Sequence, residues 1–394
     1  MRKLVLLAPI FTLAACGGAG PQSVGSSAAP AGAPQSPANN HSFVNPTVQK
    51  TYSAIGGVHS YSYSTQTGGN AQSAQLYAGD SSTARNSGIT VDYNPRDAIF
   101  EVKISAPNAN VSQTLRFQDP LHRTDFGGLR EPQTGVPRLS AGGIQYLQAG
   151  SRKEPVTFDP AQSDMVPVGD PTGIYNNVSF FYQKPGTETK YVTFAGYVRN
   201  NTSVVQELLP GGGFRILQNN TLERAAFTFG ERTDLDAVPK TGSATYNGAM
   251  VATMVYNPLR DSVNNAPTYF QWIEGRSKTT VDFGASSFTL DLTGTVFAPQ
   301  YDAYTTKQAV LGAGATFTAT GNGRIDLVNA GGFLGQFTAA SFNQGGAMPV
   351  NIAGSSIDGA FFGPAAAEVG GGFRIVGGTP DQRIDILGAF TGTK

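Results

Sequence analysis

Apolar and polar residues alternate along the C-terminal part of the chain. Phe288, Leu290 and Leu292 would lie on one face of an extended strand, and Thr289 and Asp291 on the other, because successive strand residues point to opposite faces. Similar short runs, bounded by Gly, Asn or Pro, occupy residues 242–255, 268–274, 278–283, 324–327, 331–342, 357–362, 371–377 and 383–386. Roughly eight short strands in series predict an up-and-down antiparallel barrel over 239–394, whose closure removes exposed sheet edges.

Residues 41–238 are less regular. Short strand-like pieces are separated by long loops rich in Pro and Gly, and the longest loop covers 119–143. A loop of that length in a compact domain is usually functional or disordered. The pieces occupy residues 90–93, 98–104, 113–117, 179–183, 191–198 and 214–217. The predicted fold class is therefore all-β, with an N-terminal irregular β-domain over 41–238 followed by the barrel.

The composition agrees with β-structure and excludes some partners. The chain has 49 Gly, 24 Phe and 15 Tyr, and charged residues make up 14%, below the usual ~25% of globular domains. The formal net charge is +0 and no basic stripe is present, so nucleic acid is not an expected partner. No apolar run after residue 15 approaches the ~20 residues of a membrane helix.

The N-terminal residues have the layout of a secretory signal. Charged Arg2 and Lys3 precede an apolar run over 4–15, and small residues lead to Cys16. Leu13-Ala14-Ala15-Cys16 fits the bacterial lipobox, which predicts a signal peptide over 1–15 and acylation of Cys16. An ordinary signal peptide with an incidental cysteine is the alternative. Cys16 is the only cysteine, and a loose thiol is unexpected in an exported protein.

The following residues, 16–40, predict a lipidated, flexible tether. Apart from Cys16 and Val24 they are Gly, Ala, Ser, Pro, Gln and Asn with no charge, a composition that cannot bury enough apolar surface to offset the entropy of ordering. Several acyl chains on one residue would give firm anchoring, since each buried CH₂ contributes about 0.8 kcal/mol. Gly17 stands where Asp would favour inner-membrane retention, so we expect the outer membrane.

Motifs for catalysis are missing from the sequence. No Walker loop and no G-x-S-x-G elbow is present, and we predict that the protein is not an enzyme. The histidines, His41, His59 and His122, show no metal-ligand spacing, so no cofactor is expected, with haem as a candidate ligand. His122 could ligate haem iron and Arg123 could pair with a propionate; the alternative is a solvated loop histidine. Trp272 is expected to fill the barrel rather than stack on a ligand.

Two short glycine-containing patterns have a structural interpretation. The hexapeptide GGGFRI occurs at 211–216 and 370–375, and we interpret both copies as a glycine turn entering a strand, not as a duplicated domain. In the hairpin 357–375, Gly363-Pro364 should stop the first strand and residues 365–368 should form one helical turn. The glycines after it should supply positive φ, and Glu368 should cap N–H groups inside that turn.

This hairpin also carries a family resemblance. GAFFGPAAAEVGGGFRI resembles the closing hairpin of transferrin-binding-protein-B-like surface lipoproteins, with Phe362 where Tyr is common. The stretch 239–251, PKTGSATYNGAMV, is similar to the first barrel strand of that family, and the C-terminal GAFTGTK to its final strand. The matching hairpin residues are Gly359, Phe361, Gly363, Pro364, Ala366, Glu368, Gly370, Gly371 and Phe373.

The resemblance implies a handle domain followed by a barrel, in one lobe where the full-length transferrin receptors have two. Single-lobe relatives bind haem carriers, haemoglobin or complement regulators, and commonly reach the surface through a Slam-like translocon. The leading hypothesis is a non-enzymatic, lipid-anchored outer-membrane surface protein that binds haem, iron or a carrier protein, with a TonB-dependent receptor as a further partner. Binding would use handle loops, above all 119–143, and loops at one barrel end. The alternative is a structural, adhesion or shielding lipoprotein that recruits another protein with no role in nutrient uptake.

Overall fold

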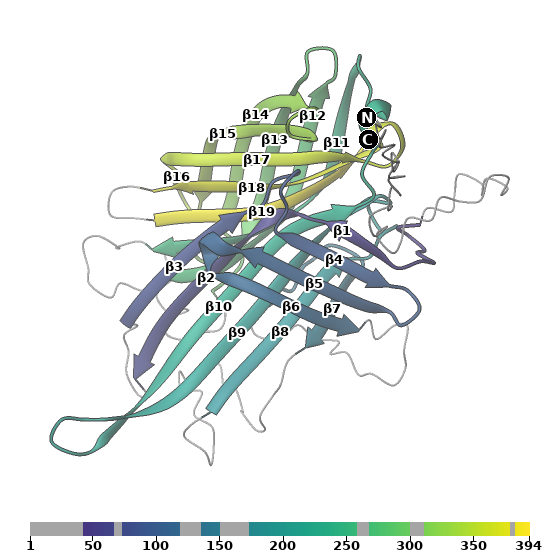
Figure 1. Cartoon of the computed structure of the whole chain (residues 1–394). Helices are drawn as coiled ribbons and strands as arrows, with labels where there is room; N and C mark the ends of the chain where they lie inside the picture. The colour runs from purple at the N-terminus through teal and green to yellow at the C-terminus, as the bar shows by residue number, and fades with distance from the viewer. Residues whose placement is uncertain are drawn as a thin grey trace, which may run out of the picture. The chain divides into compact units, whose positions relative to one another are not determined.

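The structure is a computed structural model that describes residues 42–66, 73–118, 135–149, 173–257, 268–299, 311–378 and 383–394. Ala38–Lys394 forms one compact unit. In the described part of this unit the named elements are β-strands and three short 3₁₀ turns, η1 (Pro107–Ala109), η2 (Leu235–Ala237) and η3 (Pro364–Ala366) (Figure 1). No helix within these ranges is long and apolar enough to cross a membrane.

The C-terminal strands form a closed antiparallel barrel. Each strand pairs with the next along the chain, and the last pairs with the first, which confirms the predicted up-and-down barrel. A short extra strand, β16 (Ala347–Pro349), pairs only with β15. The eight barrel strands are β11 (Ser243–Asn257), β12 (Tyr269–Asp282), β13 (Ser287–Val296), β14 (Thr316–Asp326), β15 (Gly332–Asn343), β17 (Ile352–Phe362), β18 (Glu368–Gly377) and β19 (Arg383–Thr393).

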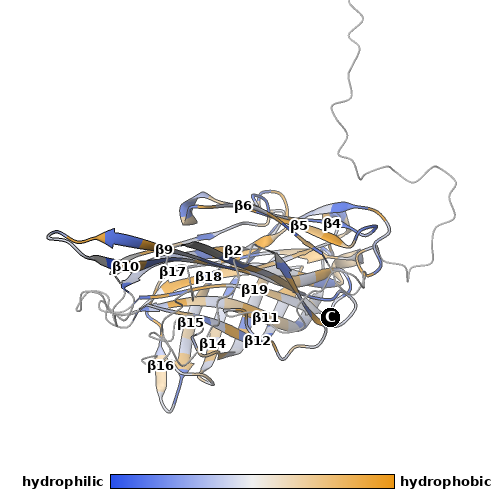
Figure 2. Cartoon of the chain, turned by 90° about the horizontal axis from the view of Figure 1, so that it is seen from below, coloured by the Kyte–Doolittle hydropathy of each residue, from blue (hydrophilic) through white to orange (hydrophobic). Residues whose placement is uncertain are grey.

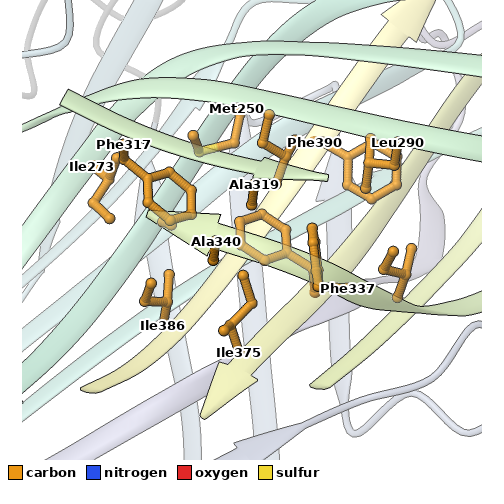
Figure 3. Packing of buried hydrophobic residues seen from close by; sticks show 14 of the residues in the cluster. Met250, Ile273, Leu290, Phe317, Ala319, Phe337, Ala340, Ile375, Ile386 and Phe390 are labelled. Carbon is orange, nitrogen blue, oxygen red and sulfur yellow. The ribbon is translucent and has the colours of Figure 1, made fainter. Parts of the chain in front are cut away.

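The predicted alternation of β13 is confirmed. Phe288, Leu290 and Leu292 are buried, whereas Thr289 and Thr293 are exposed. The inward side chains of the barrel strands meet in one apolar cluster (Figure 3). Fully burying a side chain such as Leu or Phe contributes about 1.5–3 kcal/mol, and the interior of a barrel of this size is filled by its own side chains.

Runs 268–274 and 278–283, predicted as separate, belong to the single strand β12. Gly275 interrupts the apolar pattern without ending the strand, because it faces Gly294 of β13. A Cβ on Gly275 would lie 1.8 Å from the carbonyl oxygen of Thr293. The glycine is therefore required by close strand packing and not by a turn.

N-terminal to the barrel, a six-stranded antiparallel sheet has the order β3-β2-β10-β9-β8-β7. It is more regular than predicted, because β9 and β10 pair over their full length, through polar stretches such as 199–203 that show no apolar alternation. Its strands are β2 (Ile55–Gln66), β3 (Ser73–Ser81), β7 (Ile144–Ala149), β8 (Gly173–Gln183), β9 (Val192–Leu208) and β10 (Phe214–Gly230).

A four-stranded sheet, in the order β1-β4-β5-β6, packs on the six-stranded one. Its strands are β1 (Lys50–Ser53), β4 (Ile89–Asn94), β5 (Ile99–Ala106) and β6 (Val111–Gln118). Val102 and Phe117 share an apolar cluster with Phe180 and Phe227 of the larger sheet. We call the two sheets together the handle. Its boundary with the barrel as a separate domain at residue 238 stays a prediction.

The closing hairpin differs from the predicted one in detail. Strand β17 ends at Phe362, as expected, but the short turn η3 covers Pro364–Ala366 and not the predicted 365–368. However, positive φ occurs at Gly363 (71°), Ala365 (50°) and Ala366 (54°), and the predicted positive φ at the later glycines is wrong. Residues 370–372 lie inside the regular strand β18.

Candidate binding site between handle and barrel and at the handle tip

The residues predicted to bind lipid or haem, Cys16, His122 and Arg123, lie outside the described residues. Lipidation of Cys16 and haem contact by His122 and Arg123 therefore stay predictions. His59 is described, and it is buried between handle and barrel. Among the described residues, no group of three or more His, Cys, Asp or Glu side chains could hold a metal ion.

Handle strands β2, β9 and β10 lie against barrel strands β18 and β19. Their backbones approach closely where Gly56 meets Gly372, since a Cβ on Gly372 would lie 2.6 Å from the Cα of Gly56. Apolar side chains surround this crossing; Ile55 and Val192 of the handle cluster with Ala360 and Phe362 of the barrel. This close approach requires that Gly372 has no side chain, whereas a Cβ on Gly56 would instead meet Ala226 and Phe227 of β10.

Glu368 fixes the barrel to the handle. Its carboxylate accepts hydrogen bonds from the backbone N–H groups of Lys190 (2.7 Å), Tyr191 (2.8 Å) and Val192 (3.1 Å). These donors precede and begin β9, so the prediction that Glu368 caps its own turn is wrong. The residue is buried, and three charge-assisted bonds compensate its removal from water.

A second buried carboxylate, Asp385 of β19, accepts from both parts of the molecule. Arg374 of β18 donates through Nε (3.1 Å) and Nη2 (2.7 Å). From the handle, His59 Nε2 (3.3 Å) and the Tyr77 hydroxyl also donate to it. Burial would raise the pKa of Asp385, but the His59 and Arg374 partners hold that pKa well below its usual range. The alternation along β19 puts Ile384 on the inner face of the barrel and Asp385 on the outer face, and the structure confirms this. The handle covers the outer face at this position, so Asp385 is buried as well.

The described end of the predicted binding loop, residues 135–143, lies on the outside of the barrel. Trp272 Nε1 donates to the carbonyl oxygen of Gly135 (2.8 Å), and its ring meets Phe181 edge-on at 5.5 Å. Trp272 therefore packs against the handle, and the expectation that it fills the barrel is wrong. Glu274 accepts from the backbone N–H groups of Ser140 (2.7 Å) and Ala141 (2.9 Å). We call this segment the strap.

A cleft of about 640 Å³ opens between the strap and the barrel wall. Its volume suits a small ligand, since such pockets span roughly 300–1,000 Å³. The polar groups at the cleft are engaged: Glu274 binds the strap, and Arg276 pairs with Glu188 (3.0 Å). No histidine is among its described lining residues. The lining includes Leu139, Phe194, Val251, Glu274, Arg276 and Phe297.

At the opposite end of β9 and β10, the hairpin extends beyond its neighbours (Figure 1). Strand β8 pairs with β9 only as far as Val204, and β2 pairs with β10 only from Leu217. Among the described residues, 205–216 therefore have no strand partner outside the β9–β10 hairpin itself. We call this segment the finger. Its turn has successive φ values of 96°, 92° and 89° at Gly211, Gly212 and Gly213, which only glycine adopts without strain.

The finger exposes apolar side chains to solvent. Leu208 is 81% exposed, Leu209 is 40% exposed and Val205 is 37% exposed. In Figure 2 the hairpin turns from blue to orange towards this end. The glycine turn was predicted from the sequence, but the exposed finger was not. The signal that could have found it is Leu208-Leu209-Pro210 directly before a glycine turn, because apolar residues on a turn have no core to enter.

Comparison with known proteins identifies the barrel. Residues 238–394 match the family model of the C-lobe and N-lobe beta barrels of Tf-binding protein B. This C-terminal region thus has a transferrin-binding protein B-like fold. A search of curated protein sequences found no match.

Solved structures of transferrin-binding protein B are also similar. The intact Ap-TbpB with N and C lobes is 14% identical, with 88% of this chain and 77% of that chain covered and a TM-score of 0.30. A single-substitution variant of the vaccine antigen from Haemophilus parasuis Hp5 is 14% identical, with coverage of 88% and 76% and a TM-score of 0.32. The isotype 1 protein from serogroup B Neisseria meningitidis is 12% identical, with coverage of 88% and 77% and a TM-score of 0.26. The fold assignment rests on the family match.

Proposed function

We propose that this protein is a non-enzymatic, lipid-anchored surface protein of bacteria that binds a carrier protein for iron or haem. The barrel match supports a binding protein, because the matched relatives are named for binding transferrin. The finger is the single observation that carries the proposal: a regular two-stranded hairpin holds Leu208 and Leu209 in solvent. Exposed apolar side chains on a rigid element are typical of protein-binding surfaces.

Burying the apolar side chains of the finger against a partner would contribute enough free energy for recognition. Removing a Leu side chain from water contributes about 1.5–3 kcal/mol, and a few such residues dominate most interfaces. The paired strands pre-organise the finger, so little ordering entropy would be lost on binding. The cleft beside the strap supports a second contact region, where a small apolar group could bind. Its carboxylate and guanidinium already have partners, which favours binding over acid–base catalysis.

Anchoring and display complete the proposal. An acylated Cys16 and the tether over 16–40 would hold the folded part at the outer membrane, facing outward, with a Slam-like translocon and a TonB-dependent receptor as partners. Mass spectrometry of the mature protein tests the anchor, since an unmodified Cys16 thiol would contradict it. Protease shaving of intact cells tests display, because only a surface-exposed protein would be lost.

The finger is tested by substitution. Immobilised protein is titrated with iron-loaded transferrin and with haemoglobin, comparing wild type with Leu208→Ser/Leu209→Ser. The control is Val328→Ser, because Val328 is 80% exposed on the barrel, far along the chain from the finger. We expect the finger variant to bind at least about tenfold more weakly, equivalent to about 1.4 kcal/mol, and the control to bind like wild type. Equal affinities for all three would refute the finger as the binding element.

Haem is tested separately. Haemin is added to the purified protein and to His122→Ala, and the Soret band is measured. A band that weakens in the variant would assign His122 as a haem ligand. A protein partner recovered without any iron or haem would instead favour a structural, adhesion or shielding role.

A further inference from the structure

The cluster around Asp385 joins handle and barrel through side chains that can change charge. His59 lies on β2 and the Tyr77 hydroxyl comes from β3, while the barrel supplies Arg374 from β18 and Asp385 from β19. Arg224 of β10 stands opposite His59 in the sheet, with its guanidinium over Phe270 at 5.1 Å. Arg383 of β19 lies over the Tyr77 ring at 5.3 Å. The rings of Tyr77 and Phe270 lie beside His59, so Asp385 and Arg374 are the charged groups that act on it directly.

The neighbouring glycine shows how tightly this cluster is assembled. Gly79 stands opposite His59 in β3. A Cβ there would lie 2.9 Å from His59 Cδ2 and 3.0 Å from both Arg374 Nη2 and the Tyr77 hydroxyl oxygen. These three side chains therefore pack closely over Gly79, and a Cβ there would have to displace them. A change in the charge or hydrogen bonding of His59 therefore directly alters the contact between handle and barrel.

Neutral His59 fits this environment and protonated His59 does not. The neutral ring donates from Nε2 to Asp385, and its Nδ1 has no hydrogen-bond partner among the described residues. A second proton would sit on Nδ1 as a fully buried donor without an acceptor, which costs about 1–3 kcal/mol or more for a charged group. The carboxylate that could balance the new charge is already paired with Arg374.

We propose that His59 is an acid-sensitive lock between handle and barrel, whose protonation in mildly acidic solution favours separation of β2 and β3 from β18 and β19. This inference does not rest on the identity of any ligand. It concerns the contact between two parts of the chain, and it would hold whether or not the finger binds a carrier protein.

The direction of the pH effect follows from linkage. Burial lowers the pKa of His59 below its ordinary value of 6.5, although the Asp385 hydrogen bond and charge act in the opposite direction. The unfolded or separated state then binds more protons than the closed state. Stability is therefore fully present above pH 6.5 and is lost as the pH falls from there towards the lowered pKa.

The first test measures unfolding between pH 7.5 and pH 5 for wild type, His59→Gln and the control His122→Gln. Gln keeps an N–H donor and cannot gain the charge. We expect the wild-type unfolding constant to rise between pH 7 and 5, by at most about 25-fold for an unfolded-state histidine whose pKa is 6.5. His59→Gln should lose most of this dependence and His122→Gln should keep it. The same pH dependence in His59→Gln and wild type would overturn the proposal.

A second test uses the wild-type protein and stays informative if His59→Gln does not fold. Amide hydrogen exchange, corrected for the intrinsic pH dependence of the rate, is compared at pH 7 and pH 5. We expect protection to fall over residues 55–66 and 73–81 while residues 287–296 of the barrel stay protected. An equal loss in all three segments, or no loss in any, would show that His59 does not act as a lock between handle and barrel.

Discussion

The hexapeptide Gly-Gly-Gly-Phe-Arg-Ile occurs in two regions of opposite character. In the finger, Gly211, Gly212 and Gly213 have positive φ, and an added Cβ would meet nothing within 4 Å. In β18, residues 370–372 are extended, and each added Cβ would meet atoms within 2.4–2.7 Å. The first copy needs glycine for its backbone conformation, and the second needs glycine for space.

The arginines of the two copies differ in the same way. Arg215 pairs with Glu207 across the finger, and both side chains are about 40% exposed or more. Arg374 pairs with Asp385, whose side chain is only 2% exposed. One sequence thus produces a solvated ion pair in one place and part of a buried lock in the other. The difference comes from what packs on each copy, since only the second is covered by the handle.

The largest expected effect is at the buried arginine. Arg374→Met should destabilise the protein by about 3–5 kcal/mol, because it leaves the carboxylate of Asp385 buried without its counter-ion. Chemical denaturation with urea measures the change in the free energy of unfolding. A loss below about 1 kcal/mol would mean that the two copies are energetically alike.

The next largest effect is expected at the residue that lies two positions before each hexapeptide. This residue is Glu368 in the barrel and Leu209 in the finger. Glu368→Ala should cost about 3 kcal/mol, because three backbone N–H groups of the handle lose their acceptor. Leu209→Ala should change stability by less than about 0.5 kcal/mol, as expected for an exposed site. Comparable losses in these two variants, measured by thermal unfolding, would contradict the assignment of Glu368 as a handle contact.

A smaller loss is expected from Gly372→Ala. The new methyl group would be forced against the backbone of Gly56, and overpacking of this kind costs about 1–3 kcal/mol. Because the clash lies between handle and barrel, increased proteolysis within 55–66 should accompany the lower melting temperature. Wild-type resistance to protease would show that the backbones can move apart without cost.

Gly212→Ala should cost less, about 1 kcal/mol, since it strains one residue at positive φ but meets no neighbour. Amide exchange should increase within 205–216 and stay unchanged in the barrel. Destabilisation that spreads to β13 would indicate that the finger supports the rest of the fold.

The smallest effect is expected for Arg215→Met, within about 0.5 kcal/mol of wild type, because exposed ion pairs contribute little. The same denaturation series as for Arg374→Met provides the comparison. Raising the salt concentration should reduce even this difference, since exposed charges are screened.

Much of the barrel was predictable from sequence. The period-2 pattern identified β13, and the turn signals gave approximately the right number of strands, because one face of each strand enters the core. In the handle, β4, β5 and β6 were found, but β1, β2, β3 and β7 were missed and β8, β9 and β10 were predicted too short. Their polar stretches gain stability from pairing with neighbours, a contribution that no local pattern displays.

Less of the candidate site could be predicted from the sequence. The strap was expected as part of the binding loop, and its described residues instead pack on Trp272 and Glu274. Trp272 was expected to fill the barrel, but it packs outside the barrel against the handle, and Asp385 also lies beneath the handle. Nothing within a strand shows which segment covers it from outside.

The sequence by itself determined the all-β class, the inward face of barrel strands such as β13 and the glycine turn at 211–213, because these depend on residues close together along the chain. Tertiary structure decided the rest. It made Glu368 bind the handle, turned Asp385 and His59 into one buried cluster, and gave two identical hexapeptides different roles. Burial and hydrogen-bond partners come from residues as far as 326 positions apart, and the cost of burying a charge depends on those partners alone.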